Sequence, residues 1–382
     1  MRSDDLFVGT YARGGAAEAV TAAAWVQAML DAEVALASAC VAEGLITAEA
    51  GTAIERACRR GHFDVDAIAA GAGEHITPVL PFLRELRDRV GGEFADAVHL
   101  GATSQDIIDT AAMLVSRRAL MVIGTDADRA AAAAAGLAAT HRGTAMVGRT
   151  LLQRALPTSF GLVAAGWLVG LQRAAAELER VGDTLAVQMG GPVGSRPPQI
   201  ATHVAATLGL AEPVLAWHTE RTRIVQLAAA LGAAAGTAGK VARDVTLLAQ
   251  SEVGELREGV AGRGGSSAMA HKHNPVASVS VLACSRRVPA LVATLLAGME
   301  QELQRAAGAW QAEWGTLSEL LSLTGSAVAW LADLLEHLDV DQTRMRENLA
   351  ALGASGVSAA LEPESAVRDA AELVDRALGE AQ

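Results

Sequence analysis

The stretch RTRIVQLAAALGAAAGTAGKVARDVTLLAQSEVGELRE (residues 221–258) decides the fold class of this chain of 382 residues. Its apolar residues follow helical spacing, which predicts one continuous helix over 221–258. Such a helix is about 50 Å or more long at 1.5 Å per residue, whereas the average globular helix has only about 11–12 residues. A helix of this length implies an elongated bundle, and its apolar face usually finds partners in other subunits as well.

Helical patterning continues on both sides of that stretch. The same spacing predicts helices over 20–43, 126–141, 157–181, 274–307 and 310–338. No segment shows the sustained alternation that a sheet requires, and residues 350–382 predict two short helices around a Gly/Ser/Pro break. The sequence therefore predicts an all-α protein. The predicted loops at 71–75, 99–106, 146–157, 189–199 and 259–275 are rich in Gly, Pro, Ser and His.

The composition narrows the class of partner. The chain is 51% hydrophobic but only 3% aromatic, so its core must consist of Ala, Leu and Val. The formal charge of −12, without a basic tract, argues against nucleic acid or an anionic membrane as a partner. The apolar stretch 160–171 is shorter than the roughly 20 residues that a membrane span needs, and 224–239 is only weakly apolar. Both predict helices buried in the bundle.

The cysteines and the start of the chain indicate a compartment. Cys40, Cys58 and Cys284 are odd in number and widely spaced, without a CxxC pair, which is typical of buried reduced thiols. The opening residues MRSDDLFVGTYARGG contain no apolar signal core. We therefore expect a cytoplasmic protein.

The loop GVAGRGGSSAMAHKHNP (259–275) combines mobility, hydroxyl groups and a cation. Asn274 and Pro275 predict a helix start, because Asn is a good N-cap and Pro a good first-turn residue. The positive end of that helix would then face the loop as an anion site. Lys272 is one of only two lysines in a chain that otherwise uses arginine, so we expect a functional role for its compact charge.

The chemistry that this loop could perform is proton transfer. The sequence has neither a GxSxG elbow nor a GxxxxGK phosphate loop, so acyl transfer and nucleotide phosphates are disfavoured. A serine alkoxide held among dipoles and cations can remove a proton beside a carboxylate, and the closed loop would exclude water. His271 and His273 are alternative metal ligands, but no third ligand is in view. We expect no metal.

The same loop resembles the signature GSSxMPxKxNP of the fumarase/aspartase superfamily. The matching residues are Gly265, Ser266, Ser267, Met269, Lys272, Asn274 and Pro275, with Ala270 in place of the usual proline. Three further segments are similar to that superfamily: HLGATSQDIIDTA (99–111), GRTLLQRALPTSFG (148–161) and KVARDVTLLAQSEVGEL (240–256). The resemblance covers about residues 15–350.

Within the superfamily, the chain most resembles the branch of bacterial 3-carboxy-cis,cis-muconate cycloisomerases. The stretches that carry this likeness are SSAMAHKHNPV, TSQDIIDTA, WHTERTR (217–223) and GAWQAEW (308–314). Adenylosuccinate and argininosuccinate lyases and fumarases have a proton-transferring His where this chain has Leu151, and the cycloisomerase branch also lacks it. Thr222 and Leu303 depart from the branch, which usually has Asp and His there.

The resemblance implies a role for each site residue. Ser266 is the expected general base in the elimination direction and the proton donor in the other, with Ser267 supporting it through the loop backbone. Lys272 and Asn274 would hold the carboxylate beside the reacting carbon. Thr103, Ser104 and Gln105 would bind a carboxylate from another subunit. His75 and His99 would lie at the site. Arg154 would add positive charge where the usual acid is missing.

Structural explanations stay open for several of these residues. Thr103 and Ser104 fit N-caps of a helix over 107–115, a role that is compatible with binding. His75 is also explained by packing near Pro78, and Arg154 by an ordinary solvated salt bridge. His218, beside Trp217, fits a structural and a functional role equally well.

The resemblance also implies an architecture and a reaction. We expect a fumarase/aspartase-like fold with an N-terminal helical domain (1–105), a central long-helix bundle (106–348) and a shortened C-terminal segment (349–382). The implied protein is a homotetramer whose sites are each built from three subunits. It would reversibly convert 3-carboxy-cis,cis-muconate, a polycarboxylate, into a carboxymuconolactone in protocatechuate degradation, without a metal or organic cofactor.

Two alternatives remain. The first is a lyase of the same fold that releases an amine or nitrite from a substituted succinate to give fumarate, as adenylosuccinate, argininosuccinate and nitrosuccinate lyases do. The second is a non-catalytic helical oligomer that serves as a scaffold. The intact Ser266, Lys272 and Asn274 argue against the scaffold.

Overall fold

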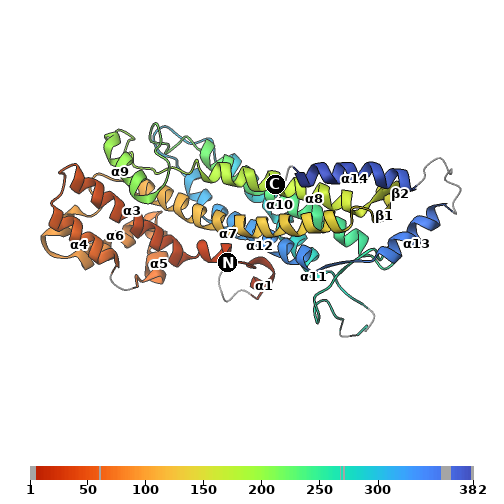
Figure 1. Cartoon of the computed structure of the whole chain (residues 1–382). Coiled ribbons are helices and arrows are strands. Elements are labelled where there is room, and N and C mark those ends of the chain that lie inside the picture. Colours follow the sequence, from red (N-terminus) through yellow and green to blue (C-terminus); the bar gives the residue numbers. More distant parts are fainter. Residues whose placement is uncertain (1–5, 60–61, 267, 270–271, 354–362, 380–382) are drawn as a thin grey trace.

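The protein is an elongated assembly of helices. The computed structural model describes residues 6–59, 62–266, 268–269, 272–353 and 363–379. Figure 1 shows the long helices running side by side, with short helices gathered at one end and a small β-hairpin at the other. The predicted all-α bundle is confirmed.

The first part of the chain consists of shorter helices. They are α1 (Val8–Tyr11), α2 (Ala16–Ala19), α3 (Ala22–Ala42), α4 (Ala48–Arg59), α5 (Val65–His75), α6 (Val79–Val90) and the 3-10 helix η1 (Gly92–Ala97). Helix α3 confirms the helix predicted over 20–43, and it begins where the Thr21 side chain accepts a hydrogen bond from the Ala24 amide (3.2 Å). The loop predicted at 71–75 is wrong, because these residues form the last turn of α5.

Five long helices form the central bundle. They are α7 (Ser104–Thr140), α8 (Phe160–Gly182), α10 (Thr222–Leu248), α11 (Val276–Ala297) and α12 (Ala309–Glu336). Helix α7 has 37 residues and is therefore about 55 Å long at 1.5 Å per residue. It packs along α8 and α12, while α10 packs against α8, α11 and α12. Around the bundle lie α9 (Pro198–Leu208), α13 (Gln342–Gly353) and α14 (Pro363–Gly379).

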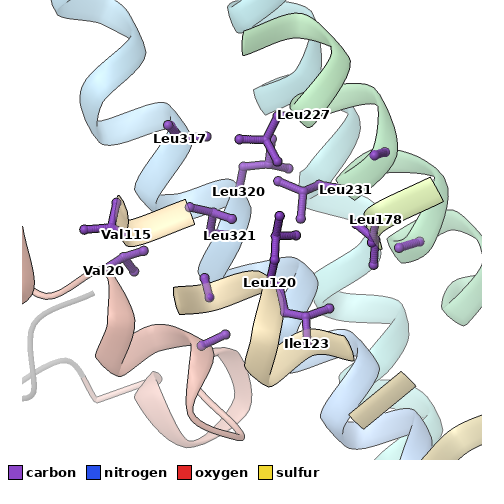
Figure 2. Close-up of a cluster of buried hydrophobic side chains, with 14 of the residues drawn as sticks. Val20, Val115, Leu120, Ile123, Leu178, Leu227, Leu231, Leu317, Leu320 and Leu321 are labelled. Carbon is purple, nitrogen blue, oxygen red and sulfur yellow. The ribbon is translucent and has the colours of Figure 1, made fainter. Parts of the chain in front are cut away.

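The core of the bundle is aliphatic, as the composition predicts. Figure 2 shows one cluster, in which side chains of α7, α8, α10 and α12 meet. The buried members are Val20, Val115, Leu120, Ile123, Leu178, Leu227, Leu231, Leu317, Leu320 and Leu321. Each fully buried leucine contributes about 1.5–3 kcal/mol relative to an exposed one. Small residues allow close approach elsewhere: a Cβ on Gly325 of α12 would lie only 2.2 Å from the Ala16 Cβ of α2.

The expectation that the chain has no strands is wrong for two short segments. Strands β1 (Ala145–Thr150) and β2 (Gln153–Ser159) form an antiparallel hairpin, and β3 (Leu256–Glu258) pairs with β4 (Leu338–Val340). The residues predicted as a loop over 146–157 are therefore mostly strand. An irregularity between Val147 and Arg149 interrupts the hairpin, and β3 has only three residues, so neither produces a long alternating pattern.

Several helix boundaries also differ from prediction. Helix α8 begins at Phe160 rather than 157, because the Ser159 hydroxyl caps it by accepting a hydrogen bond from the Leu162 amide (3.1 Å). Helix α10 ends at Leu248 rather than 258, and α11 ends at Ala297 rather than 307. The helices predicted over 107–115 and 126–141 are one helix, α7. The break predicted in the last part of the chain falls outside the described residues.

Three helices of the described chain are long and apolar enough to cross a membrane by length and composition alone: α3, α10 and α11. In this fold α10 buries its apolar face on neighbouring helices, as predicted for 224–239. Helix α11 differs, because only 28% of its most apolar window is buried within the chain. An apolar surface of that kind indicates a contact with another molecule.

Candidate active site

The loop with the serine pair grows from a closed stem. The Asn274 amide and side chain both donate to the Gly264 carbonyl (2.8 and 3.1 Å), and Gly265 forms a bridge with His273. Gly264 has a φ of +78°, and a Cβ there would lie 2.2 Å from the Asn274 carbonyl oxygen. Only glycine fits such a position, so the stem holds the two ends of the loop together.

The reactive groups lie on the exposed part of this loop. The Ser266 hydroxyl is half-buried and accepts a long hydrogen bond from the Ala268 amide (3.4 Å). Lys272 is exposed; its amide donates to the Met269 carbonyl (3.0 Å), and its side chain has no hydrogen bond or ion pair to a residue that the structure describes. Ser267, Ala270 and His271 lie outside the described residues, so the predictions made for them stay predictions. Ser266 and Lys272 are both free to meet a substrate.

The anion site predicted at the start of α11 is wrong. The helix begins at Val276 with Pro275 in the capping position, and Asn274 does not cap it. The Glu258 carboxylate instead accepts hydrogen bonds from the amides of Ala277 (3.0 Å) and Ser278 (2.9 Å). The positive end of α11 is therefore satisfied by the protein's own carboxylate. This contact could not be predicted from the sequence, because Glu258 lies in a different element, β3.

An ion pair anchors the stem to the bundle. Arg263 donates to both Asp333 carboxylate oxygens from its position beside Gly264, and Arg13 lies 3.3 Å from the same carboxylate. Burial alone would raise the pKa of Asp333, but the Arg263 hydrogen bonds and the Arg13 charge hold it below its ordinary value. Asp333 belongs to the last turns of α12, so the serine loop is fixed to that end of the bundle.

The second predicted site lies at the start of α7. Thr103 is the residue before the helix, so its capping role is confirmed, and its amide donates to Asp106 (3.1 Å). Its hydroxyl accepts a hydrogen bond from Arg305 (3.0 Å), and Ser104 is half-buried beside it. The Gln105 side chain is fully buried and donates to Asp109 (3.0 Å). Thr103 and Ser104 are thus the two members of this group near the surface.

A buried pair behind this loop fixes its shape. The Asp106 carboxylate lies 2.8 Å from His218 Nε2 and accepts hydrogen bonds from the amides of Gly190 (3.0 Å) and Gly191 (2.9 Å). Asp106 and His218 are both buried, which assigns His218 a structural role. Sequence reasoning did not connect Asp106 with His218, because 112 residues separate them.

Arg305 is a site residue that the sequence did not single out. One guanidinium nitrogen donates to Thr103, and Nη1 is buried without a partner among the described residues. Burial lowers the pKa of Arg305 below its ordinary value, although the Asp106 and Asp109 charges oppose this. A desolvated guanidinium with a free donor beside a threonine hydroxyl is suited to binding a carboxylate. The sequence does not distinguish Arg305 from the many other arginines, because its partner Thr103 lies 202 residues away.

The two predicted histidines occupy the same end of the molecule. His75 is the last residue of α5, and its Nε2 is buried without a partner in the part of the chain that the structure describes. His99 has a φ of +65°, and its Nδ1 lies 2.6 Å from the buried Glu33 carboxylate of α3. His75 thus has a buried nitrogen that lacks a described partner, and His99 has a carboxylate partner. Both features are typical of histidines in binding sites.

Leu151 and Arg154 lie in the hairpin at the opposite end. Leu151 is at the tip, where its side chain is 96% exposed, and Arg154 is exposed on β2 without an ion pair to a described residue. The neighbouring Arg149 binds the buried Glu255 carboxylate through two hydrogen bonds (2.7 and 2.8 Å). The hairpin is thus tied to Glu255 only two residues before its tip, and the Leu151 side chain is presented to the surroundings.

One chain does not bring these groups together. Helices α7 and α12 are joined by Trp310 and Asp109 near their starts (3.0 Å) and by Arg129 and Glu336 further on (2.9 Å). The twenty residues of α7 between these contacts span about 30 Å. The serine loop is anchored through Asp333, near the second contact, and Thr103 lies just before the first. Figure 1 shows α7 and α12 side by side. Within one chain, the serine loop and Thr103 therefore lie too far apart to contact the same small substrate.

No group of three or more His, Cys, Asp and Glu residues suited to a metal ion occurs within the described ranges. The groups suited to holding a carboxylate are instead serine and threonine hydroxyls, Lys272 and Arg305. Their donors and charges suit an anionic organic substrate.

These features define an all-α lyase, and comparison with known proteins agrees. The model of a family described as "Lyase" matches residues 12–290, so the chain belongs to this family, the fumarase/aspartase family. A 3-carboxy-cis,cis-muconate cycloisomerase of Bradyrhizobium diazoefficiens is 44% identical over 92% of this chain and 81% of the relative. A nitrosuccinate lyase of Streptomyces davaonensis is 42% identical over 95% of this chain and 81% of the relative. The crystal structure of the 3-carboxy-cis,cis-muconate lactonizing enzyme of Pseudomonas putida is 31% identical, with a TM-score of 0.89, covering 98% of both chains.

Proposed function

We propose that this protein is a 3-carboxy-cis,cis-muconate cycloisomerase. The observation that carries the proposal is Leu151 at the exposed tip of the hairpin. The resemblance places a proton-transferring histidine there in the succinate lyases and fumarases, and leucine cannot transfer a proton. The similarity to cycloisomerases of several bacteria over most of the chain supports the same assignment.

The reaction needs one proton transfer and one carbon–oxygen bond. In the lactonising direction a substrate carboxylate oxygen adds to one carbon of a conjugated double bond, and the Ser266 hydroxyl gives its proton to the neighbouring carbon. Ser266 then regains a proton from solvent. In the reverse direction the Ser266 alkoxide takes the proton back while the carbon–oxygen bond breaks.

Negative charge accumulates beside the reacting carbon in both directions. Lys272, on the same loop as Ser266, supplies a compact cation for the nearby carboxylate. Thr103, Ser104 and Arg305 form a second carboxylate site, and a substrate with three carboxylates requires more than one such site. The proposal therefore places Ser266 and Lys272 of one chain opposite the Thr103 loop of another.

A homotetramer would bring these ends together. Supporting this assembly, α11 exposes a row of apolar residues at helical spacing: Val279, Ala290, Ala293 and Ala297. Helix α10 exposes Ala229, Ala233 and Gly236, small side chains that permit close helix contact. Burying such faces against further copies would remove apolar surface from water. The domain division at residues 105 and 348 fits this scheme, since the shared helices all lie between them.

We also propose a cytoplasmic location. Cys40, Cys58 and Cys284 are free and buried, and burial raises the pKa of the Cys58 thiol to about 12. Thiols of this kind stay protonated and unreactive. They suit a reducing compartment, although they do not demand one.

The test is an ultraviolet assay with purified protein and 3-carboxy-cis,cis-muconate. We expect the absorbance of the conjugated diene to fall, and Ser266→Ala to abolish this while folding and assembling normally. Ser251→Ala, which removes an exposed hydroxyl from a nearby turn, is the matched control and should keep full activity. A correctly assembled protein that leaves the absorbance unchanged would refute the assignment.

The nitrosuccinate lyase relative supports a second candidate, elimination from a substituted succinate to give fumarate. Leu303, 86% exposed in the segment that leads to Arg305, stands where the cycloisomerase branch commonly has His. Release of fumarate from nitrosuccinate, with no turnover of the muconate, would favour this candidate. Normal assembly without turnover of either substrate would favour the scaffold.

A further inference from the structure

Glu33 is a buried carboxylate whose single partner in the described chain is His99. The Glu33 side chain is 1% exposed and lies in the middle of α3, and its Oε1 is 2.6 Å from His99 Nδ1. A carboxylate in such a position costs free energy unless it is hydrogen-bonded. The folded protein therefore needs the hydrogen bond with His99 to offset the burial of the Glu33 carboxylate. The same hydrogen bond restricts which nitrogen of His99 can bind another group.

The backbone on both sides of His99 is held by other groups. Arg87 of α6 donates to the Val98 carbonyl (3.4 Å), and Arg196 donates to the Leu100 carbonyl (2.8 Å). His99 itself is in the left-handed region, at a φ of +65°, which is uncommon for a residue other than glycine. Because the backbone has these supports, the contact with Glu33 acts mainly on the imidazole ring.

The two nitrogens of an imidazole are not equivalent once one of them is bound. The nitrogen that donates to a carboxylate keeps its proton, and the other becomes the nitrogen that faces a ligand. With Nδ1 committed to Glu33, only Nε2 of His99 remains for a substrate. His99 lies four residues before Thr103, on the loop that leads to the carboxylate site.

We propose that Glu33 is a positioning residue: it holds Nδ1–H of His99, fixes the orientation and tautomer of the ring, and assigns Nε2 to a carboxylate of the substrate. The role assigned to His99 rests on the proposed function. Glu33 itself touches no substrate. Cys40 of α3 and Cys58 of α4 sense the Glu33 charge, and Arg87 and Arg196 donate to the backbone beside His99. None of these four groups replaces Glu33 as a partner of the ring in the described chain.

The experiment compares Glu33→Gln, Glu33→Ala and His99→Ala. Glutamine keeps the shape and can accept from Nδ1–H, whereas alanine releases the ring. We expect KM to rise about threefold in Glu33→Gln and about tenfold in Glu33→Ala, while kcat changes less than threefold, since a positioned contact acts on binding. The double variant Glu33→Ala/His99→Ala should be no worse than His99→Ala alone, because the two act as one unit.

A spectroscopic readout separates positioning from simple destabilisation. Solid-state NMR of protein labelled with 15N-histidine, with the His99 signals assigned by their loss in His99→Ala, should show Nδ1 protonated and hydrogen-bonded in the wild type. Glu33→Ala should shift these signals and Glu33→Gln should largely retain them. Asp126→Asn removes another buried carboxylate that forms an ion pair, with Arg129, and should leave both KM and the His99 signals unchanged.

Two results would overturn the proposal. Additive effects of Glu33→Ala and His99→Ala on kcat/KM would mean that Glu33 acts independently of the ring. Unchanged His99 signals in Glu33→Ala would mean that the ring is fixed by something else. Because the NMR measurement needs no substrate, it tests Glu33 even if the wild type fails to turn over the muconate, so a failure of the proposed function stays distinguishable.

Discussion

The tip of the β1–β2 hairpin carries a conformational cost that the single chain does not explain. Leu151 and Leu152 alone connect the two strands, with φ values of +50° and +63°. Turns with two positive φ values favour Asn-Gly, and a residue with a Cβ costs roughly 1–2 kcal/mol in this region. The two leucines together therefore cost about 2–4 kcal/mol.

Burial within the chain does not offset this cost. The side chains of Leu151 and Leu152 are 96% and 71% exposed. Contact with a second copy of the chain could offset the cost, since each leucine that becomes fully buried contributes about 1.5–3 kcal/mol. The proposed tetramer, in which the site is shared between chains, supplies such a contact. We therefore expect the tip to pack against another subunit near its carboxylate site.

The discriminating change is Leu151→Ala, which keeps the Cβ and therefore the backbone strain. If the tip stays in solvent, removing an exposed side chain changes stability by no more than about 0.5 kcal/mol. If another subunit buries it, the same truncation costs about 2–5 kcal/mol. We expect the larger value, equivalent to assembly weakened by at least about tenfold.

The assay measures the concentration at which the tetramer dissociates, by sedimentation or mass photometry, together with kcat/KM. Leu45→Ala, which truncates a 53% exposed leucine in the turn between α3 and α4, is the control and should change neither. The reasoning is refuted if Leu151→Ala assembles and turns over like the wild type. It is refuted equally if Leu152→Gly, which relieves strain, stabilises the enzyme with no loss of activity.

Two further predictions concern buried carboxylates with shifted pKa values. Burial raises the pKa of Glu313 despite its hydrogen bonds from Arg221, so the ionised form of Glu313 destabilises the fold. The free energy of unfolding should therefore fall as pH rises through the folded-state pKa. Glu313→Gln should remove this pH dependence, which urea unfolding at pH 5 and pH 8 measures. The pKa of Asp333 is lowered, so the anchor that it forms with Arg263 stabilises the fold fully above the ordinary pKa and is lost as pH falls through the lowered pKa. Asp333→Asn should lower kcat several-fold at neutral pH and speed hydrogen exchange in the stem of the serine loop, and equal exchange in both proteins would contradict the anchor.

The long helices could be predicted from the sequence because their signal is repeated many times. Helix α10 contains 27 residues at one spacing, so the pattern identifies it even though its end was placed ten residues too late. The hairpin could not be predicted in this way. Its strands have six and seven residues, and an irregularity near Arg149 breaks their alternation. Periodicity needs length, and short strands do not provide it.

The parts of the site that could be predicted are those that lie close together in the sequence. Ser266 and Lys272 are separated by five residues, and their unusual spacing within a glycine-rich loop was sufficient to identify them. Glu33 and Arg305 could not be found, because each acquires its meaning from a partner in another element. Glu33 meets His99 across 66 residues, and Arg305 meets Thr103 across 202.

The separation of the site residues is itself informative about how such a protein works. Ser266 and Thr103 lie near opposite ends of helices that are held rigidly by contacts such as the one between Trp310 and Asp109. No loop movement in one chain closes a gap of about 30 Å or more along α7, so we expect the proposed assembly to close it. Activity should therefore disappear on dilution below the dissociation concentration even though each chain keeps its helices. A chain that retained full turnover as a monomer would require a site quite different from the one proposed.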